Sequence, residues 1–149
     1  MLDLISGLKQ TREETLNYFA LSDDALERSY APGKWSVRYL LHHLADSETV
    51  LYYRIRRVLS EPNQVIWVYD QDAWARALDY ATVPLEISRR VYDATREAVI
   101  YTARHYPGSE KIPFVHSQTG LRTLADEFEK VVTHNRHHLD QIAQALSAT

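Results

Sequence analysis

Five of the seven histidines stand in two clusters, and the imidazole nitrogens of histidine are common ligands for transition metals. His42 and His43 form the first cluster, and His134, His137 and His138 form the second. Side chains four residues apart on a helix lie over one another, so His134 and His138 can hold one ion between them. A third imidazole from a facing helix would leave coordination positions open, as in catalytic metal sites.

Helical geometry indicates which histidines of the second cluster point inward. At about 100° per residue, His134 lies about 40° from His138. The same face carries Val131 and Ile142, and it is therefore the apolar one. His137 lies about 100° from His138, on the polar side, and is expected at the surface.

In the first cluster, His43 lies about 60° from Leu40 and borders the apolar stripe of its segment. His42 points about 100° away, and we expect it at the surface or against a neighbouring segment. We therefore predict one divalent metal ion, Zn, Ni or Fe, held by His43, His134 and His138. A cluster of hydrogen-bonded core histidines without metal is the alternative, because a histidine pair at this spacing also arises by chance.

Two of the charged residues that follow His43 on the same segment are further candidates for the site. Asp46 lies one helical turn later and could accept a hydrogen bond from a ligand histidine, act as a fourth ligand or a catalytic group, or be solvated. Arg54 lies about three turns from His43 and could anchor an anionic substrate or extend to the surface. His105, at a helix end, and His116, in a loop, are not expected to be ligands.

Four long segments place apolar residues at spacings of three and four, which predicts amphipathic helices. The predicted helices run over residues 2–19, 37–59, 84–104 and 123–146, with short helical turns at 25–29 and in the stretch up to residue 78. Residues 64–69 and 112–115 are short apolar stretches, expected to be extended or irregular. We expect an all-α four-helix bundle with short extra helices and long connecting loops, formed as a single domain over residues 1–149.

The composition excludes several classes of protein. The chain has 149 residues, 17 basic and 20 acidic side chains and a net charge of −3, which gives no electrostatic reason to expect a nucleic-acid partner. It has no cysteine, so disulfides and thiolate ligands are absent. No signal peptide and no run of about 18 apolar residues is apparent, and we expect a cytoplasmic protein without membrane contact.

Two motifs resemble the signatures of the DinB/YfiT-like superfamily. Residues 31–48, APGKWSVRYLLHHLADSE, contain Trp-Ser followed by six residues, His43 and an apolar-acidic continuation. Residues 134–142, HNRHHLDQI, contain His-x-x-x-His followed by Gln-Ile. Residues 69–84 are also similar to the YfiT-type branch, so the resemblance covers most of the chain.

The resemblance implies a four-helix bundle of up-up-down-down order, a homodimer, and one divalent ion held by His43, His134 and His138. It further implies a metal-dependent enzyme that acts on a small molecule. We expect transfer of a low-molecular-weight thiol such as bacillithiol or mycothiol, with metal-dependent hydrolysis as the first alternative. A non-catalytic dimeric metal-binding or interaction module is the second alternative. Asp46 is the candidate for a catalytic base.

Overall fold

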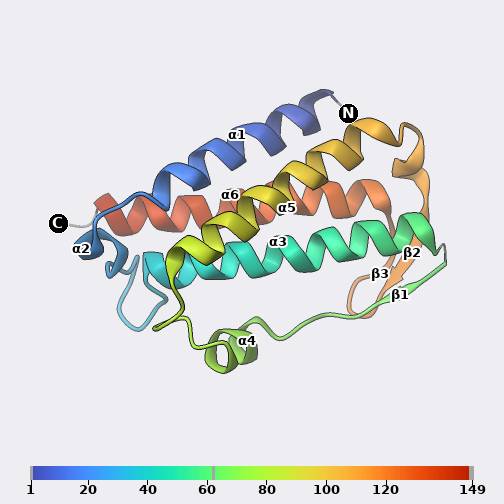
Figure 1. Ribbon diagram of the computed structural model, residues 1–149. Helices are drawn as coiled ribbons and strands as arrows, with labels where there is room; N and C mark the ends of the chain where they lie inside the picture. Colours follow the sequence, from blue (N-terminus) through green and yellow to red (C-terminus); the bar gives the residue numbers. More distant parts are fainter. Residues whose placement is uncertain (1, 62, 148–149) are drawn as a thin grey trace.

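Four long helices form a bundle in the computed structural model, which describes residues 2–61 and 63–147 (Figure 1). They are α1 (Leu2–Tyr18), α3 (Val37–Ser60), α5 (Leu85–His105) and α6 (Leu124–Ser147). The predicted four-helix, all-α fold is confirmed, and each predicted end of these four helices lies within one residue of the observed end. The short helix predicted at 25–29 lies instead at Asp23–Leu26. None of the helices described combines the length and apolar character that crossing a membrane requires.

The directions of the helices differ from the order that the resemblance implied. Helices α3 and α5 run parallel to each other, and α1 and α6 run the opposite way (Figure 1). The order along the chain is therefore down-up-up-down. Helix α3 packs against α5 and α6, and α1 packs against the same two helices. Because α3 and α5 are parallel neighbours, the chain needs a long connection from the end of one to the start of the other.

This connection covers α3. It contains β1 (Val65–Ile66) and α4 (Gln71–Ala77), and it runs back along the outer side of α3 (Figure 1). Arg54 of α3 donates from Nη2 to the backbone oxygen of Trp67 over 2.7 Å, and the hydroxyl of Tyr69 lies 2.6 Å from Oγ of Ser47. Polar side chains of α3 are thus covered by a segment that is distant from them in sequence.

The remaining short elements are α2 (Asp23–Leu26), η1 (Ser109–Lys111), β2 (Pro113–His116) and β3 (Gly120–Thr123). Strand β2 pairs antiparallel with β3 and parallel with β1. Gly120 has a φ of 74°, a conformation that glycine adopts without strain, at the start of the returning strand. The sequence predicted extended stretches but not this sheet, because a two-residue strand carries no periodicity and its partner lies far along the chain.

Side chains at the helix starts fix where the two long histidine-bearing helices begin. Oγ of Ser36 accepts from the backbone N–H of Tyr39 over 3.4 Å, at the start of α3. A carboxylate oxygen of Asp126 accepts from the backbone N–H of Thr123 over 2.7 Å, at the start of α6. Both starts lie within one residue of the predicted ones.

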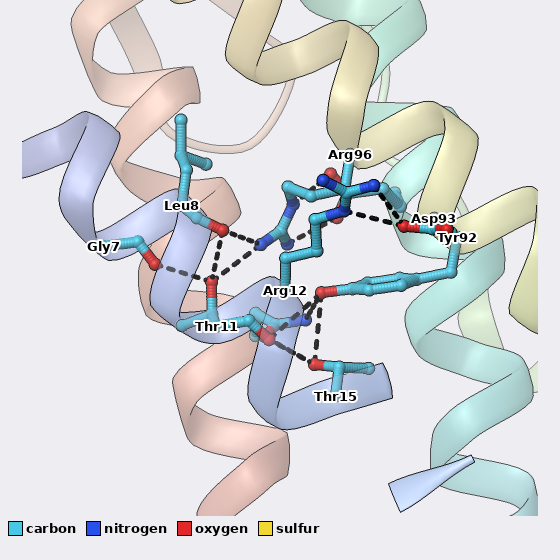
Figure 2. A network of polar contacts seen from close by, with 10 residues as sticks. Gly7, Leu8, Thr11, Arg12, Thr15, Tyr92, Asp93 and Arg96 are labelled. Atoms are coloured by element: carbon cyan, nitrogen blue, oxygen red, sulfur yellow. Dashed lines mark hydrogen bonds and ion pairs between the residues drawn. The ribbon is translucent and has the colours of Figure 1, made fainter. Parts of the chain in front are cut away.

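A buried polar network ties α3 to α1 and α5 (Figure 2). Arg96 of α5 is fully buried, and its Nε and Nη2 each donate to the carboxylate of Glu48 over 2.7 Å. Its Nη1 donates to Oγ1 of Thr11 over 2.7 Å and to the backbone oxygen of Leu8 over 3.1 Å. Glu48 lies on α3 between the turn that carries His43 and the end of the helix, so this network helps to fix that helix within the bundle.

Candidate metal centre

Three histidines from two helices converge inside the bundle. His43 comes from α3, and His134 and His138 come from α6. Nε2 of His134 lies 3.2 Å from Nε2 of His43 and 3.2 Å from Nε2 of His138. A tetrahedral site with metal–nitrogen bonds of about 2.0–2.1 Å separates its ligand nitrogens by about 3.3 Å. The spacing of these nitrogens therefore fits a single ion of the size of zinc.

The hydrogen bond of His138 to Gln141 leaves Nε2, the nitrogen that faces the cluster, free to bind a metal. Its Nδ1 lies 2.7 Å from Oε1 of Gln141, an acceptor, so Nδ1 carries the proton and Nε2 keeps a lone pair. The amide nitrogen of Gln141 lies 3.2 Å from Nε2 of His137, which agrees with this orientation of the amide. This lone pair lies on the nitrogen that is 3.2 Å from Nε2 of His134, so one cation could bind both nitrogens. The donor set therefore fits a bound cation.

Burial keeps the three imidazoles neutral. It lowers the pKa of His43 to about 3 and the pKa of His134 to about 2. The charge of His138 adds to both shifts, and that of His43 adds to the shift of His134. Burial also lowers the pKa of His138. Neutral imidazole is the form that binds a transition metal. Metal binding near neutral pH therefore requires no prior deprotonation of these three side chains.

Residues around His43 link the cluster to the connection that covers α3. The Trp35 ring packs on the His43 ring with their centroids 5.1 Å apart. Oγ of Ser47 lies 3.2 Å from Nε2 of His43 and 2.6 Å from the hydroxyl of Tyr69. No role for Ser47 or Tyr69 followed from the sequence. Ser47 could have been found from its position one turn after His43, whereas Tyr69 carries no local signal because it meets α3 only in the folded chain.

A pocket of about 330 Å³ opens beside the cluster. His138 forms part of its wall, together with Trp35, and its rim carries an ammonium and a carboxylate. The lining residues are Tyr30, Gly33, Lys34, Trp35, Leu40, Gln71, Asp72, His137, His138 and Gln141. A small polar molecule can therefore reach the side chain of a candidate ligand.

Asp46 is not part of the histidine cluster. Its carboxylate accepts a short hydrogen bond from the hydroxyl of Tyr80, and burial raises the pKa of Asp46. This contact joins α3 to the chain that follows α4. A catalytic role for Asp46 stays a prediction.

The neighbouring histidines lie as expected. His137 is exposed, as predicted, and contacts the Gln141 side chain. Of the two expected positions for His42, the structure shows the one against a neighbouring segment. The residue is 1% exposed and packs against Tyr80, and its Nδ1 lies 2.7 Å from Oγ of Ser88. The segment that leads into α5 covers the face of α3 that an isolated helix would present to water.

His105 and His116 lie outside the cluster within the part of the chain that the structure describes. His105 stacks on Tyr101 near the end of α5. His116 is buried at the end of β2, where its Nδ1 accepts from the backbone N–H of Gln118 over 3.3 Å. The site thus draws on the two predicted clusters alone.

Comparison with known proteins agrees with this geometry. A protein of Oceanobacillus iheyensis named "Putative metal-dependent hydrolase" is 31% identical over 135 residues, which cover 90% of this chain and 76% of that protein. A protein of the same name from Halalkalibacterium halodurans is 28% identical over 142 residues, 93% of this chain and 82% of the relative.

A solved structure extends the comparison to the fold. YfiT from Bacillus subtilis is described as a probable metal-dependent hydrolase with an unusual four-helix bundle topology. The two structures superpose with a TM-score of 0.87 at 27% sequence identity. The match covers 96% of this chain and 83% of the YfiT chain. The model of the DinB superfamily matches residues 7–142. With the sequence motifs, the bundle and the histidine cluster all in agreement, the chain belongs to the DinB superfamily and to its YfiT-like members.

Proposed function

We propose that this chain is a divalent-metal-dependent enzyme that acts on a small molecule, with His43, His134 and His138 as the protein ligands. The observation that carries the proposal is the convergence of three neutral imidazoles beside an open pocket. Three protein ligands leave positions for water or substrate, which is the pattern of catalytic sites. The names of the relatives favour hydrolysis as the reaction.

The side chains around the ligands have distinct tasks in this proposal. A bound divalent ion supplies Lewis-acid chemistry, by which a water or thiol becomes a nucleophile near neutral pH. Gln141 holds the His138 ring with Nδ1 protonated, and Trp35 covers one side of the His43 ring. Asp46 is the candidate base, and burial raises its pKa toward the range that suits proton transfer.

Thiol transfer, the reaction expected first from the sequence, is the second candidate. The same site would lower the pKa of an incoming thiol as it would that of water. The chain contains no cysteine, so the thiol has to enter as a cosubstrate. Activity on esters or amides without added thiol identifies a hydrolase, whereas activity that requires a low-molecular-weight thiol identifies a transferase.

Elemental analysis of gently purified protein tests the metal site, with two variants measured in parallel. We expect about one divalent ion per chain, since three protein ligands are the number that typically holds one catalytic metal ion. His138→Ala should lose the ion and remain folded, whereas His137→Ala, a matched histidine on the exposed side, should keep it. Full metal content and affinity in His138→Ala would refute the ligand assignment.

Absence of metal after reconstitution with Zn or Ni would favour the non-catalytic module over the enzyme. Homodimer formation and a cytoplasmic location stay predictions. Light scattering of the metal-loaded and metal-free protein measures the oligomeric state under both conditions.

A further inference from the structure

A second pocket, of about 340 Å³, lies between α3 and the connection that covers it. Its walls are largely aromatic and apolar, and its cations are arginines. The lining residues are Thr49, Val50, Tyr53, Arg54, Arg57, Ile66, Trp67, Tyr69 and Trp74. Among the residues that the structure describes, no carboxylate contributes to this lining. The pocket is large enough for a small aromatic molecule.

Arg54 gives the pocket a positive charge that is incompletely paired. Its side chain is 5% exposed, and Nη2 donates to the backbone oxygen of Trp67 over 2.7 Å. Arg54 forms a long ion pair with the buried Glu127, in which 4.0 Å separates Nη1 from Oε1, and this distance is beyond hydrogen-bond length. A guanidinium has five N–H donors, so Arg54 has donors available for an anion.

Tyr69 joins this pocket to the candidate metal centre. Its ring lies in the pocket wall and packs edge-on against Trp74, with the centroids 5.1 Å apart. Its hydroxyl lies 2.6 Å from Oγ of Ser47, which itself lies 3.2 Å from Nε2 of His43. The hydroxyl of a tyrosine is protonated near neutral pH and can donate a hydrogen bond, and burial raises the pKa of Tyr69 further.

We propose that this pocket binds the aromatic carboxylate portion of the substrate, with Arg54 and Tyr69 as its polar anchors. Trp67, a residue that is 72% exposed, and Trp74 provide flat apolar surface for the ring. Arg54 pairs with the carboxylate in the planar, two-bonded manner typical of arginine. The proposal rests on the proposed function in one respect, namely that the bound molecule is a substrate. Binding to the pocket can be measured without any enzymatic activity.

Calorimetric titration of the full chain with 1-naphthoate tests this proposal, with 1-naphthalenemethanol as the neutral analogue. We expect 1-naphthoate to bind at least about tenfold more tightly than the alcohol, the size of one hydrogen bond to a charged group. Arg54→Met should remove this preference, and Tyr69→Phe should weaken naphthoate binding several-fold. Arg56→Met is the matched control, because Arg56 lies on the same helix over the ring of Tyr52 and outside the pocket.

Three outcomes would overturn the proposal: equal affinities for the acid and the alcohol, no binding of 1-naphthoate at millimolar concentration, or the same loss in Arg56→Met as in Arg54→Met. Tyr69→Phe removes a single oxygen and gives a result even if Arg54→Met does not fold. Metal content is measured on the same samples. If the protein binds naphthoate but contains no metal, the pocket proposal is supported and the metal-dependent reaction is not. If the protein contains metal but does not bind naphthoate, the metal-dependent reaction is supported and the pocket proposal is refuted.

Discussion

Removal of the Glu48 carboxylate tests whether the buried network of Figure 2 fixes α3. In Glu48→Ala, the fully buried Arg96 keeps Thr11 and Leu8 as partners of Nη1 but loses both acceptors at 2.7 Å from Nε and Nη2. Leaving one charge of a buried pair without its partner costs about 3–5 kcal/mol. For a domain of this size, that loss corresponds to a fall in Tm of roughly 6–20 °C.

Urea denaturation followed by circular dichroism measures the free energy of unfolding of Glu48→Ala against wild type. Glu86→Ala is the control, because Glu86 forms two ion pairs, with Arg89 and Arg90, at the surface, and its removal should leave the midpoint unchanged. The double variant Glu48→Leu/Arg96→Met removes both buried charges and should be more stable than Glu48→Ala. A loss below about 1 kcal/mol in Glu48→Ala would show that the Arg96 charge is not held in a low-dielectric interior.

Three further outcomes can be measured around the candidate metal centre. Metal-free protein should lose stability as the pH falls from about 7 to 5. The native pKa values of His42 (about 4), His43 (about 3) and His134 (about 2) lie below the pKa of a histidine in the unfolded chain. The unfolded chain therefore binds more protons in this range, and acid favours it. Each histidine contributes up to about 1.4 kcal/mol per pH unit, and thermal melts of His42→Gln should show a shallower slope. Gln141→Leu should weaken metal affinity about 10–100-fold in a chelator competition while the fold is kept, and unchanged affinity would exclude an orienting role. Asp46→Asn should retain the ion and lower kcat by about 100-fold or more if its carboxylate removes a proton, so an unchanged kcat would exclude that role.

The long helices and the rotation of their histidines could be predicted because both follow from local periodicity. The repeat of apolar residues along residues 124–147 places His134 and His138 on one face wherever that helix packs. The same reasoning placed His137 on the exposed side. The meeting of His43 with this pair required only that the apolar stripes of α3 and α6 face each other, as they do.

Features made by the connection between α3 and α5 could not be predicted in this way. Helical geometry describes α3 alone, so it left open whether His42 meets solvent or a neighbouring segment, and the neighbours, Tyr80 and Ser88, come from a later segment. The contact between Tyr69 and Ser47 likewise could not be predicted, because no local sequence pattern around either residue indicates it. The strand at Val65–Ile66 has too few residues to show alternation, and it is defined by its partner in β2.

The rotation of α6 has a second physical basis besides its apolar stripe. Asn135, the neighbour of His134, is 1% exposed, accepts from Oγ1 of Thr15 over 3.1 Å and donates to the hydroxyl of Tyr92 over 3.2 Å. Adjacent residues on a helix point about 100° apart, so an amide bound toward α1 and α5 turns the imidazole of His134 toward α3. A buried amide without partners is costly, and other rotations of α6 would therefore be penalised. The interior of the bundle thus holds the histidines in register before any ion is bound, and this preorganisation favours a site of defined geometry.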